Sequence, residues 1–407
     1  MKIIENSMIV TGDEMRIIEN GYILIAEGRI DKVERGKPPN LVGEKINGQG
    51  CLVIPGLINA HVHIGDSVGK ETGLGKTVSE IVKPQSGLKH EILRRTPIEK
   101  IIRAMKDAIN EMLNGGTTTF ADFREGGANG VKLLEKAIVD SPIRALKLAR
   151  PDFYFSAKDL EKNKEGVSGR VSKEVKRLMH FSDGIGLSSP NEFTDNSLKQ
   201  ISKIAKGRKR IVATHVAEHS NSLAISMRRS GLSEVKRAVT YLRPDFLVHL
   251  THATDKDIKT VAEEKISAVC CPRANGVLGL GFPPVRKLLE SGVNVALGTD
   301  NIMINSPNLF REMDYLSKSI RAFERDPSFP SPLEIFKMVT INAAKALRME
   351  RTVGSIKRGK LANLVFIDSE AVNIKPIHDP LATLVHRVTQ DNVKMVMIDG
   401  NVALNKL

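Results

Sequence analysis

Cysteine, tryptophan and long hydrophobic runs are what this chain of 407 residues has least of. It contains three cysteines and no tryptophan. Cys51, Cys270 and Cys271 show no CxxC spacing, so neither a disulfide framework nor a cysteine-based zinc site is expected. No apolar run approaches the roughly 18 to 20 residues of a membrane-spanning helix, and the N-terminal segment lacks the apolar core of a signal peptide. We therefore expect a cytoplasmic protein without a membrane partner.

A concentrated patch of one charge sign is also missing. Lys and Arg number 61 and Asp and Glu 47, which gives a net charge of +14. A basic surplus can indicate nucleic acid or an anionic ligand. The charges are spread along the chain, however, and only short clusters occur, such as KGRKR at 206–210. We therefore expect a solvated surface and no nucleic-acid partner.

What is present is an alternation of short apolar runs with helical patterns from about residue 52 to residue 325, which is typical of βα units around a parallel sheet. One helical pattern starts at Pro97 and is followed by Gly115, both common boundary signals. The expected strands are residues 56–64, 117–123, 143–149, 183–189, 210–216, 245–251, 266–272 and 293–300. Eight such units predict an α/β protein with a (β/α)8 TIM barrel.

The two ends of the chain have a different sequence pattern, with short runs in which apolar and polar residues alternate between turn signals. We predict that residues 1–51 and 352–407 together form a small β-sandwich domain, and that residues 52–351 form the barrel domain.

Polar residues end several of the expected barrel strands. His61 and His63 point the same way, because side chains alternate along a strand. An isolated pair of this kind is equally compatible with a metal site and with two half-buried polar residues. His215, His249 and Asp300 end strands five, six and eight. Since the C-terminal strand ends of a barrel meet at one mouth, the five residues together predict one shared metal site.

The segments that carry these residues resemble the amidohydrolase superfamily, in the branch of the nucleoside, cytosine and triazine deaminases. The similar segments are VIPGLINAHVHIG, ATHVAEHS, LVHLTHATDKDI, GVNVALGTDN and the closing GSIKRGKLANLVFIDSE, in which Asn363 stands where Asp is usual. The resemblance implies that His61, His63, His215 and Asp300 bind one divalent metal, zinc by preference or ferrous iron. Strand four offers no Lys that could bridge a second metal, so a mononuclear site is expected.

The same resemblance implies a hydrolytic deaminase of an aminated N-heterocycle of the purine, pyrimidine, pterin or triazine type. Glu218 would carry protons, His249 would steady the attacking oxygen, and Asp300 would take a proton from water. A Glu in a first helical turn can instead serve as a dipole partner. A cyclic amide hydrolase of the imidazolone type is the alternative function. A non-enzymatic assembly protein is a remote one, because such a protein would be expected to have lost ligands.

The substrate is less well defined by the sequence. Adenosine-type deaminases of this branch carry a Trp-bearing segment after strand one and a His after strand four, where this chain has Ser188, so their specificity is not expected here. Arg124, Arg150 and Arg273 follow strands two, three and seven. If they line the pocket with Ser188 they favour an anionic substrate; the alternative is that they are ion-paired or face solvent.

Residues 66–95 form a long insert after strand one, of the kind that often covers an active site. Its GLGKT segment lacks the first glycine of a phosphate-binding loop, so it does not predict nucleotide binding. His90, His219 and His252 are expected outside the catalytic group. The sequence is compatible with a homo-oligomer.

Overall fold

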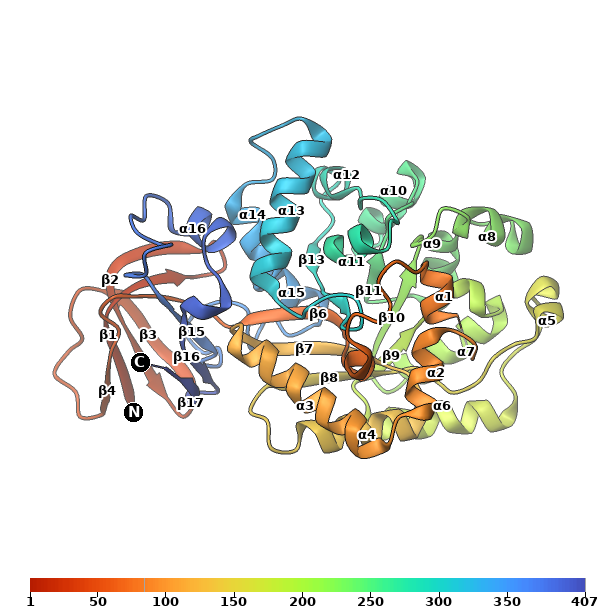
Figure 1. Cartoon of the computed structure of the whole chain (residues 1–407), viewed down its shortest axis with the longest axis horizontal. Helices are drawn as coiled ribbons and strands as arrows, with labels where there is room; N and C mark the ends of the chain where they lie inside the picture. The colour runs from red at the N-terminus through yellow and green to blue at the C-terminus, as the bar shows by residue number, and fades with distance from the viewer. Residues whose placement is uncertain (84, 407) are drawn as a thin grey trace.

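The computed structural model describes residues 1–83 and 85–406, and a barrel of parallel strands is its largest part (Figure 1). The sheet order is β13-β12-β11-β10-β9-β8-β7-β6-β14, with every neighbouring pair parallel. The strands are β6 (Leu57–His63), β7 (Thr117–Arg124), β8 (Arg144–Ala149), β9 (Gly184–Leu187), β10 (Ile211–Val216), β11 (Phe246–His249), β12 (Ser267–Cys270), β13 (Val295–Leu297) and β14 (Asp300–Asn301). Each coincides with a strand expected from the sequence, the last of which is divided into β13 and β14.

The divided last strand closes the barrel. β13 pairs with β12, whereas β14 pairs with β6 and sets Asp300 opposite Val62. Gly298 lies between them, and a side chain there would collide with His61. Asp300 itself has a positive φ of 60°, so the chain turns sharply where it reaches the first strand. The ends of the first and last strands are thereby brought to the same point of the barrel mouth.

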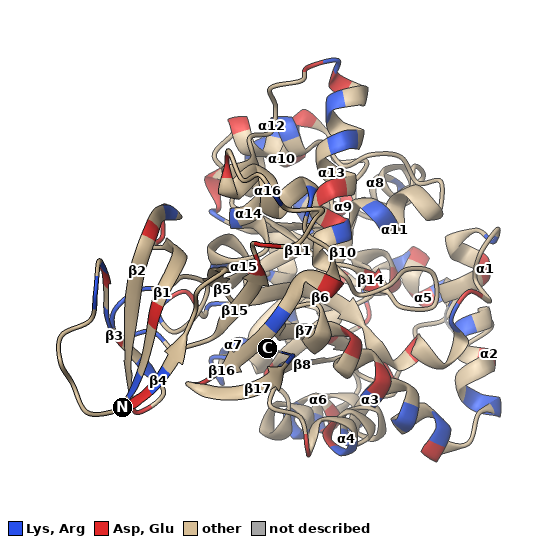
Figure 2. Ribbon diagram, turned by 60° about the vertical axis from the view of Figure 1, so that its left-hand side comes forward, with Lys and Arg blue, Asp and Glu red and all other residues tan. Residues whose placement is uncertain are grey.

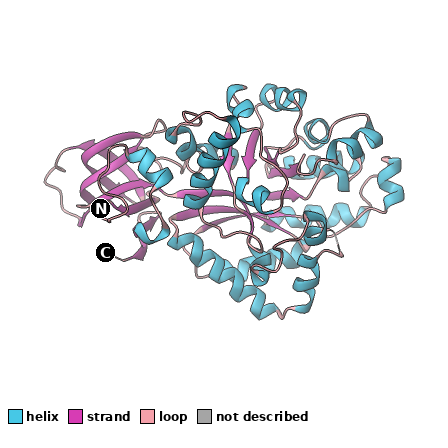
Figure 3. Cartoon of the chain, turned by 45° about the horizontal axis from the view of Figure 1, so that its top comes forward, coloured by secondary structure: helices cyan, strands magenta, loops and turns pink. Residues whose placement is uncertain are grey.

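Helices cover the outside of the barrel, as Figure 3 shows in cyan around the magenta strands. The helices are α1 (Val78–Val82), α2 (Leu88–Arg95), α3 (Ile98–Asn114), α4 (Gly127–Ile138), α5 (Ala157–Lys162), α6 (Gly169–Phe181), α7 (Asp195–Lys206), α8 (Ser222–Ser230), α9 (Glu234–Arg237), α10 (Asp255–Glu263), α11 (Pro272–Val277), α12 (Val285–Glu290), α13 (Leu309–Glu324), α14 (Pro332–Met338), α15 (Ile341–Ala346) and α16 (Pro380–His386).

The longest of them, α3, illustrates why these segments are helical. Ile101, Met105, Ala108 and Met112 recur at intervals of three or four residues and are buried against the barrel. Pro97 precedes the first turn, and the N–H of Gly115 donates to the carbonyl oxygen of Glu111 at the end. The helix therefore has the boundaries that its sequence predicts.

Strands from both ends of the chain form a separate sheet, also as expected. Its order is β17-β16-β15-β5-β1-β2-β3, with β4 beside β1. The strands are β1 (Lys2–Thr11), β2 (Arg16–Ala26), β3 (Arg29–Arg35), β4 (Glu44–Asn47), β5 (Cys51–Pro55), β15 (Leu364–Asp368), β16 (Val393–Ile398) and β17 (Asn401–Asn405). They enclose a core of their own that includes Ile4, Ile23, Val53, Phe366 and Met397.

The limits of this small domain differ from the expected ones at one end. The predicted boundary between residues 51 and 52 would cut β5, which is bonded to β1 and β15. Because β5 is followed by Gly56 and then directly by barrel strand β6, we propose that the boundary lies after Pro55.

Lys and Arg positions (blue) and Asp and Glu positions (red) are interspersed along the ribbon of the outer helices and strands in Figure 2. Within residues 1–83 and 85–406, no helix has both the length and the apolar character needed to cross a membrane.

Candidate metal centre

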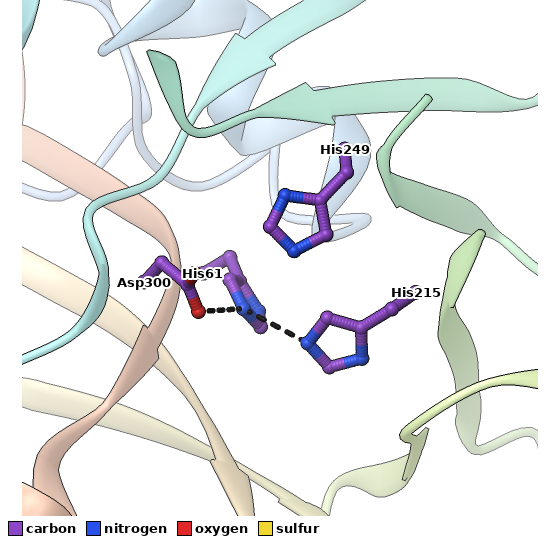
Figure 4. A group of neighbouring side chains, drawn as sticks. All are labelled: His61, His215, His249 and Asp300. Carbon is purple, nitrogen blue, oxygen red and sulfur yellow. Dashed lines mark hydrogen bonds and ion pairs between the residues drawn. The ribbon is translucent and has the colours of Figure 1, made fainter. Parts of the chain in front are cut away.

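Five side chains from four strands converge at the C-terminal end of the barrel. His61 and His63 lie on β6, His215 on β10, His249 on β11 and Asp300 on β14. The Nε2 atoms of His61 and His215 are 3.2 Å apart, and those of His63 and His215 are 3.3 Å apart. The Oδ1 atom of Asp300 lies 3.2 Å from Nε2 of His61. Figure 4 shows His61, His215, His249 and Asp300 facing a common point.

Backbone carbonyl groups determine which imidazole nitrogen faces that point. Nδ1 of His63 lies 3.1 Å from the carbonyl oxygen of Phe123, and Nδ1 of His215 lies 2.9 Å from that of Leu187. A carbonyl oxygen only accepts hydrogen bonds, so both Nδ1 atoms carry the proton. Each Nε2 atom then presents a lone pair to the centre. Two lone pairs at such a distance repel each other unless a cation lies between them.

Burial also keeps these imidazoles neutral. It lowers the pKa of His61, His63, His215 and His249 below the ordinary value of 6.5. Burial alone would raise the pKa of Asp300, but the hydrogen bond from His61 and the neighbouring histidines bring it well below its usual range. Neutral imidazoles beside an ionised carboxylate are the ligands that Zn²⁺ accepts. The donor set therefore fits one divalent metal ion.

Two alternative sets of four ligands share this point. The ligand atoms of His61, His215, His249 and Asp300 all lie within 4.8 Å of one another. His63 replaces His249 in the set implied by the sequence, and its Nε2 lies 3.5 Å from Oδ1 of Asp300. Within the described residues, Nε2 of His249 and Nδ1 of His61 are buried without a hydrogen-bond partner. Nδ1 of His249 lies 3.2 Å from Oδ1 of Asn275, whose amide nitrogen donates to Thr251.

Glu218 lies beside this centre on the loop after β10. Its Oε1 atom is 3.8 Å from Nε2 of His249. Burial raises the pKa of Glu218 to about 8, and the negative charge of Asp300 adds to the effect. The loop precedes α8, which begins only at Ser222, so Glu218 is not in a first helical turn and the dipole role considered from the sequence does not apply. Glu218 therefore holds its proton more tightly than an exposed glutamate does.

A second buried carboxylate holds the backbone next to Glu218. Ala217 has a positive φ of 48°, and its N–H donates to Oε2 of Glu234 at 2.7 Å. The hydroxyl of Ser189, on the loop after β9, donates to the other oxygen of Glu234. Glu234 therefore ties together the two loops that carry Glu218 and Ser188.

The centre opens into a cavity of about 330 Å³. His63, His215, Glu218, His249 and Asp300 lie in its wall. This volume is within the range of small-molecule sites. Among the residues predicted to contact substrate, Arg150 and Ser188 line the cavity, whereas Arg124 and Arg273 do not.

The positions of Arg124 and Arg273 correct the expectation that three arginines line the pocket. Arg124 is buried and pairs with Asp122, at 3.5 Å, and with Glu125. Asp122 and Arg124 are two residues apart in β7 and so lie on the same face of the strand. Arg273, in the first turn of α11, donates to the carbonyl oxygen of Ser306 at 3.2 Å. Both guanidinium groups are engaged elsewhere in the barrel.

The insert at residues 66–95 contributes residues to the cavity that sequence analysis did not identify. Val82, Lys89 and His90 line the wall. Lys89 is 3% exposed and pairs with Glu125, which also lines the cavity, and with Asp66 at 3.5 Å. No local pattern marks Lys89, because its partners are distant in sequence. His90 and His219, which were expected at the surface or around the catalytic group without a catalytic role, border the cavity, whereas His252 does not.

Comparisons with known proteins find relatives along almost the whole chain. The model of the amidohydrolase family matches residues 52–403. A Methanothermobacter thermautotrophicus protein, provisionally named an aminohydrolase, is 36% identical over 402 residues, which is 98% of both chains. A 5-methylthioadenosine/S-adenosylhomocysteine deaminase of Thermoanaerobacter pseudethanolicus is 30% identical over 96% of this chain and 90% of its own. A zinc-bound adenosine deaminase of Xanthomonas campestris, 23% identical, superposes with a TM-score of 0.86 over 100% of this chain and 93% of its own.

The fold and the site thus define a class of proteins, the parallel barrels that carry histidines and an aspartate at the C-terminal ends of their strands. The chain belongs to the amidohydrolase family.

Proposed function

We propose that this protein is a metal-dependent hydrolase that deaminates a small aminated N-heterocycle. The observation that carries the proposal is the place of Glu218, a carboxyl group that lines the cavity with its Oε1 atom 3.8 Å from Nε2 of His249 at the candidate metal centre and whose pKa is raised by burial. Proton transfer to a ring nitrogen requires a group that is protonated near neutral pH. The deaminase relatives support the same reaction type.

We propose His61, His63, His215 and Asp300 as the residues that hold one divalent ion, zinc by preference and ferrous iron as the alternative. When bound, such an ion supplies Lewis acidity and lowers the pKa of water from about 15.7 toward 7. A non-enzymatic role loses support, because all of these donor groups are present and converge.

The neighbouring side chains would then move protons. Glu218 donates its proton to the ring nitrogen next to the carbon that is attacked. The proton that Asp300 takes from water then passes through Glu218 to the departing ammonia, and the hydroxyl proton of the tetrahedral intermediate returns to Glu218 as the carbonyl group forms. Nδ1 of His249 faces Oδ1, the side-chain amide oxygen, of Asn275, so the Nε2 atom of His249 is an acceptor and would orient the attacking water. Asp300, which stays ionised, would take a proton from that water.

Ammonia release tests the reaction type. The zinc-loaded protein is incubated with amino-purines and their nucleosides, amino-pyrimidines, pterins and triazines, and at least one is expected to release ammonia. Opening of a cyclic imidazolone without ammonia from any member of the panel would instead establish the alternative function.

Exchange of Glu218 for glutamine tests the proton carrier. Glu218→Gln keeps the size and polarity of the side chain, so metal content should be unchanged while kcat falls by roughly 10²–10⁴. Glu264→Gln, the same exchange at an exposed position, is the matched control and should leave kcat unchanged. A Glu218→Gln variant with full kcat on a true substrate would remove Glu218 from the mechanism.

The charge of the substrate, the oligomeric state and the cellular location stay predictions. An anionic substrate was expected from three arginines, of which only Arg150 lines the cavity. A homo-oligomer is tested by light scattering of the purified protein, and a cytoplasmic location by fractionation of the source cells.

A further inference from the structure

Arg150, Ser188 and Glu192 form a closed set of hydrogen bonds in the cavity wall, here called the Arg150 cluster. Nε of Arg150 donates to the hydroxyl of Ser188 at 3.1 Å, and Nη2 donates to Oε2 of Glu192 at 2.9 Å. The hydroxyl of Ser188 donates to the same carboxylate oxygen. The guanidinium carbon also lies 4.5 Å from the centre of the Tyr154 ring. Two hydrogen bonds to the segment after β9 and the contact with the Tyr154 ring fix the orientation of this guanidinium.

The cluster leaves one acceptor and one donor for a ligand. Among the described residues, Oε1 of Glu192 and Nη1 of Arg150 have no hydrogen-bond partner. Neither atom is buried away from solvent, and both residues line the cavity, as does Tyr154. The side chain of Glu192 is 28% exposed. A group that both donates and accepts a hydrogen bond would satisfy the two atoms together.

The charge of the cluster is balanced before any ligand arrives. Glu192 compensates Arg150, Lys89 pairs with Glu125 and Asp66, and Arg229 pairs with Glu161. Every Lys and Arg among the described residues that line the cavity therefore has an acidic partner. A carboxylate entering here would lose its hydration, would find no uncompensated cation and would meet Glu192. This arrangement disfavours the anionic substrate expected from the sequence.

The size of the cavity leaves room for a substituent on the heterocycle. The cavity of about 330 Å³ lies within the range of sites that hold drug-sized ligands, about 300–1,000 Å³. That is more than a bare aminated heterocycle fills. A second part of the substrate therefore has space beside the Arg150 cluster.

We propose that the Arg150 cluster is a specificity subsite for a neutral, hydroxyl-bearing substituent on the substrate, with Glu192 accepting the hydroxyl proton and Arg150 donating to the hydroxyl oxygen. The inference deepens the proposed deamination and rests on it for the identity of the remaining part of the substrate. Glu192 and Tyr154 thereby join Arg150 and Ser188 as residues that contact substrate.

Three adenine derivatives that differ only in the N9 substituent test the subsite: 9-(2-hydroxyethyl)adenine, 9-(carboxymethyl)adenine and 9-ethyladenine. Affinity for the zinc-loaded protein is measured by titration calorimetry, and ammonia release is measured in parallel. We expect the hydroxyethyl compound to bind at least about tenfold more tightly than either of the others. Tighter binding of the carboxymethyl compound, or equal binding of all three, would overturn the proposal.

Exchange of Glu192 for glutamine should reverse the preference for charge. Glu192→Gln leaves Arg150 uncompensated, so the variant should bind the carboxymethyl compound at least about tenfold more tightly than the wild type does. Ser188→Ala removes a hydrogen bond without changing charge; it should weaken binding of the hydroxyethyl compound and cause no reversal. Glu290→Gln, which removes a carboxylate paired with Arg286 outside the cavity, is the matched control. A Glu192→Gln variant that is folded and keeps the wild-type preference would also refute the subsite.

The two proposals fail in different ways. Binding preferences as expected, without ammonia from any of the three compounds or from the wider panel, would refute deamination and support the subsite. Ammonia from all three with equal kcat/KM would support deamination and refute the subsite.

Discussion

Glu218 should make the protein less stable as the pH rises, and its replacement should remove this effect. In the folded state the pKa of Glu218 is raised from 4.5 to about 8, mainly by burial. A raised pKa means that the folded state holds the proton more tightly than the unfolded chain does. The associated stability is complete below pH 4.5 and is lost as the pH rises to 8. At about 1.4 kcal/mol per pH unit, the loss is at most about 5 kcal/mol, and less because 16% of the side chain is exposed.

Glutamine at this position cannot ionise, so it avoids the loss. The free energy of unfolding of Glu218→Gln should exceed that of the wild type by several kcal/mol, and at most about 5, at pH 9. The difference at pH 5 should be no more than about 1 kcal/mol. Urea unfolding followed by circular dichroism measures both values. Metal-free protein is used, because a bound cation would itself lower the pKa of a nearby carboxyl group.

The test of the raised pKa is whether the difference in unfolding free energy between Glu218→Gln and the wild type depends on pH. Glu264→Gln should shift the unfolding free energy by less than about 0.5 kcal/mol at either pH, because Glu264 is exposed. A difference between wild type and Glu218→Gln that is the same at pH 5 and pH 9 would show that the pKa of Glu218 is not raised. The argument for its role as an acid would then fail.

Three further predictions concern the metal ligands and the buried Lys89. His61→Ala should lose the metal and activity, whereas the wild type should hold about one divalent ion per chain in elemental analysis; two ions in the wild type would contradict a mononuclear centre. His63→Asn should weaken metal binding more than His249→Asn does if His63 is the fourth ligand, and competition with a chelator measures the order; the reverse order would favour the group that contains His249. Lys89→Met leaves Asp66 and part of the charge on Glu125 buried without their cation. The free energy of unfolding should therefore fall by roughly 3–5 kcal/mol. Lys76→Met, at an exposed position of the same insert, is the control and should change the free energy of unfolding little.

The barrel strands could be predicted because their pattern is local. Parallel strands covered on both faces appear as short continuous apolar runs; β7, for example, is buried throughout. The histidines and Asp300 could be located for a related reason, since the ends of parallel strands meet whatever the lengths of the connections between them. Strand position alone was therefore sufficient to bring His61, His63, His215, His249 and Asp300 together.

The side chains of the cavity wall could not be predicted in the same way. Arg124 and Arg150 both stand at the end of an expected strand. Asp122, on the same strand face as Arg124, pairs with the guanidinium of Arg124, which does not line the cavity. Lys89 meets Glu125 only because the insert folds back over the barrel mouth. Glu192 accepts hydrogen bonds from Arg150 and Ser188, which lie on different loops. Such pairings depend on tertiary contacts between loops, and loop sequences carry no periodic signal.

Closure of the barrel by β14 also has a consequence for biosynthesis. A ribosome makes His61 and His63 early, but Asp300 emerges only after 236 further residues and reaches the centre by pairing with the first strand. A nascent chain shorter than 300 residues lacks a complete set of ligands in either arrangement. The ligand set is therefore complete only when the ring of strands is sealed. The order of residues along the chain thus places completion of the ligand set and closure of the barrel in the same folding step.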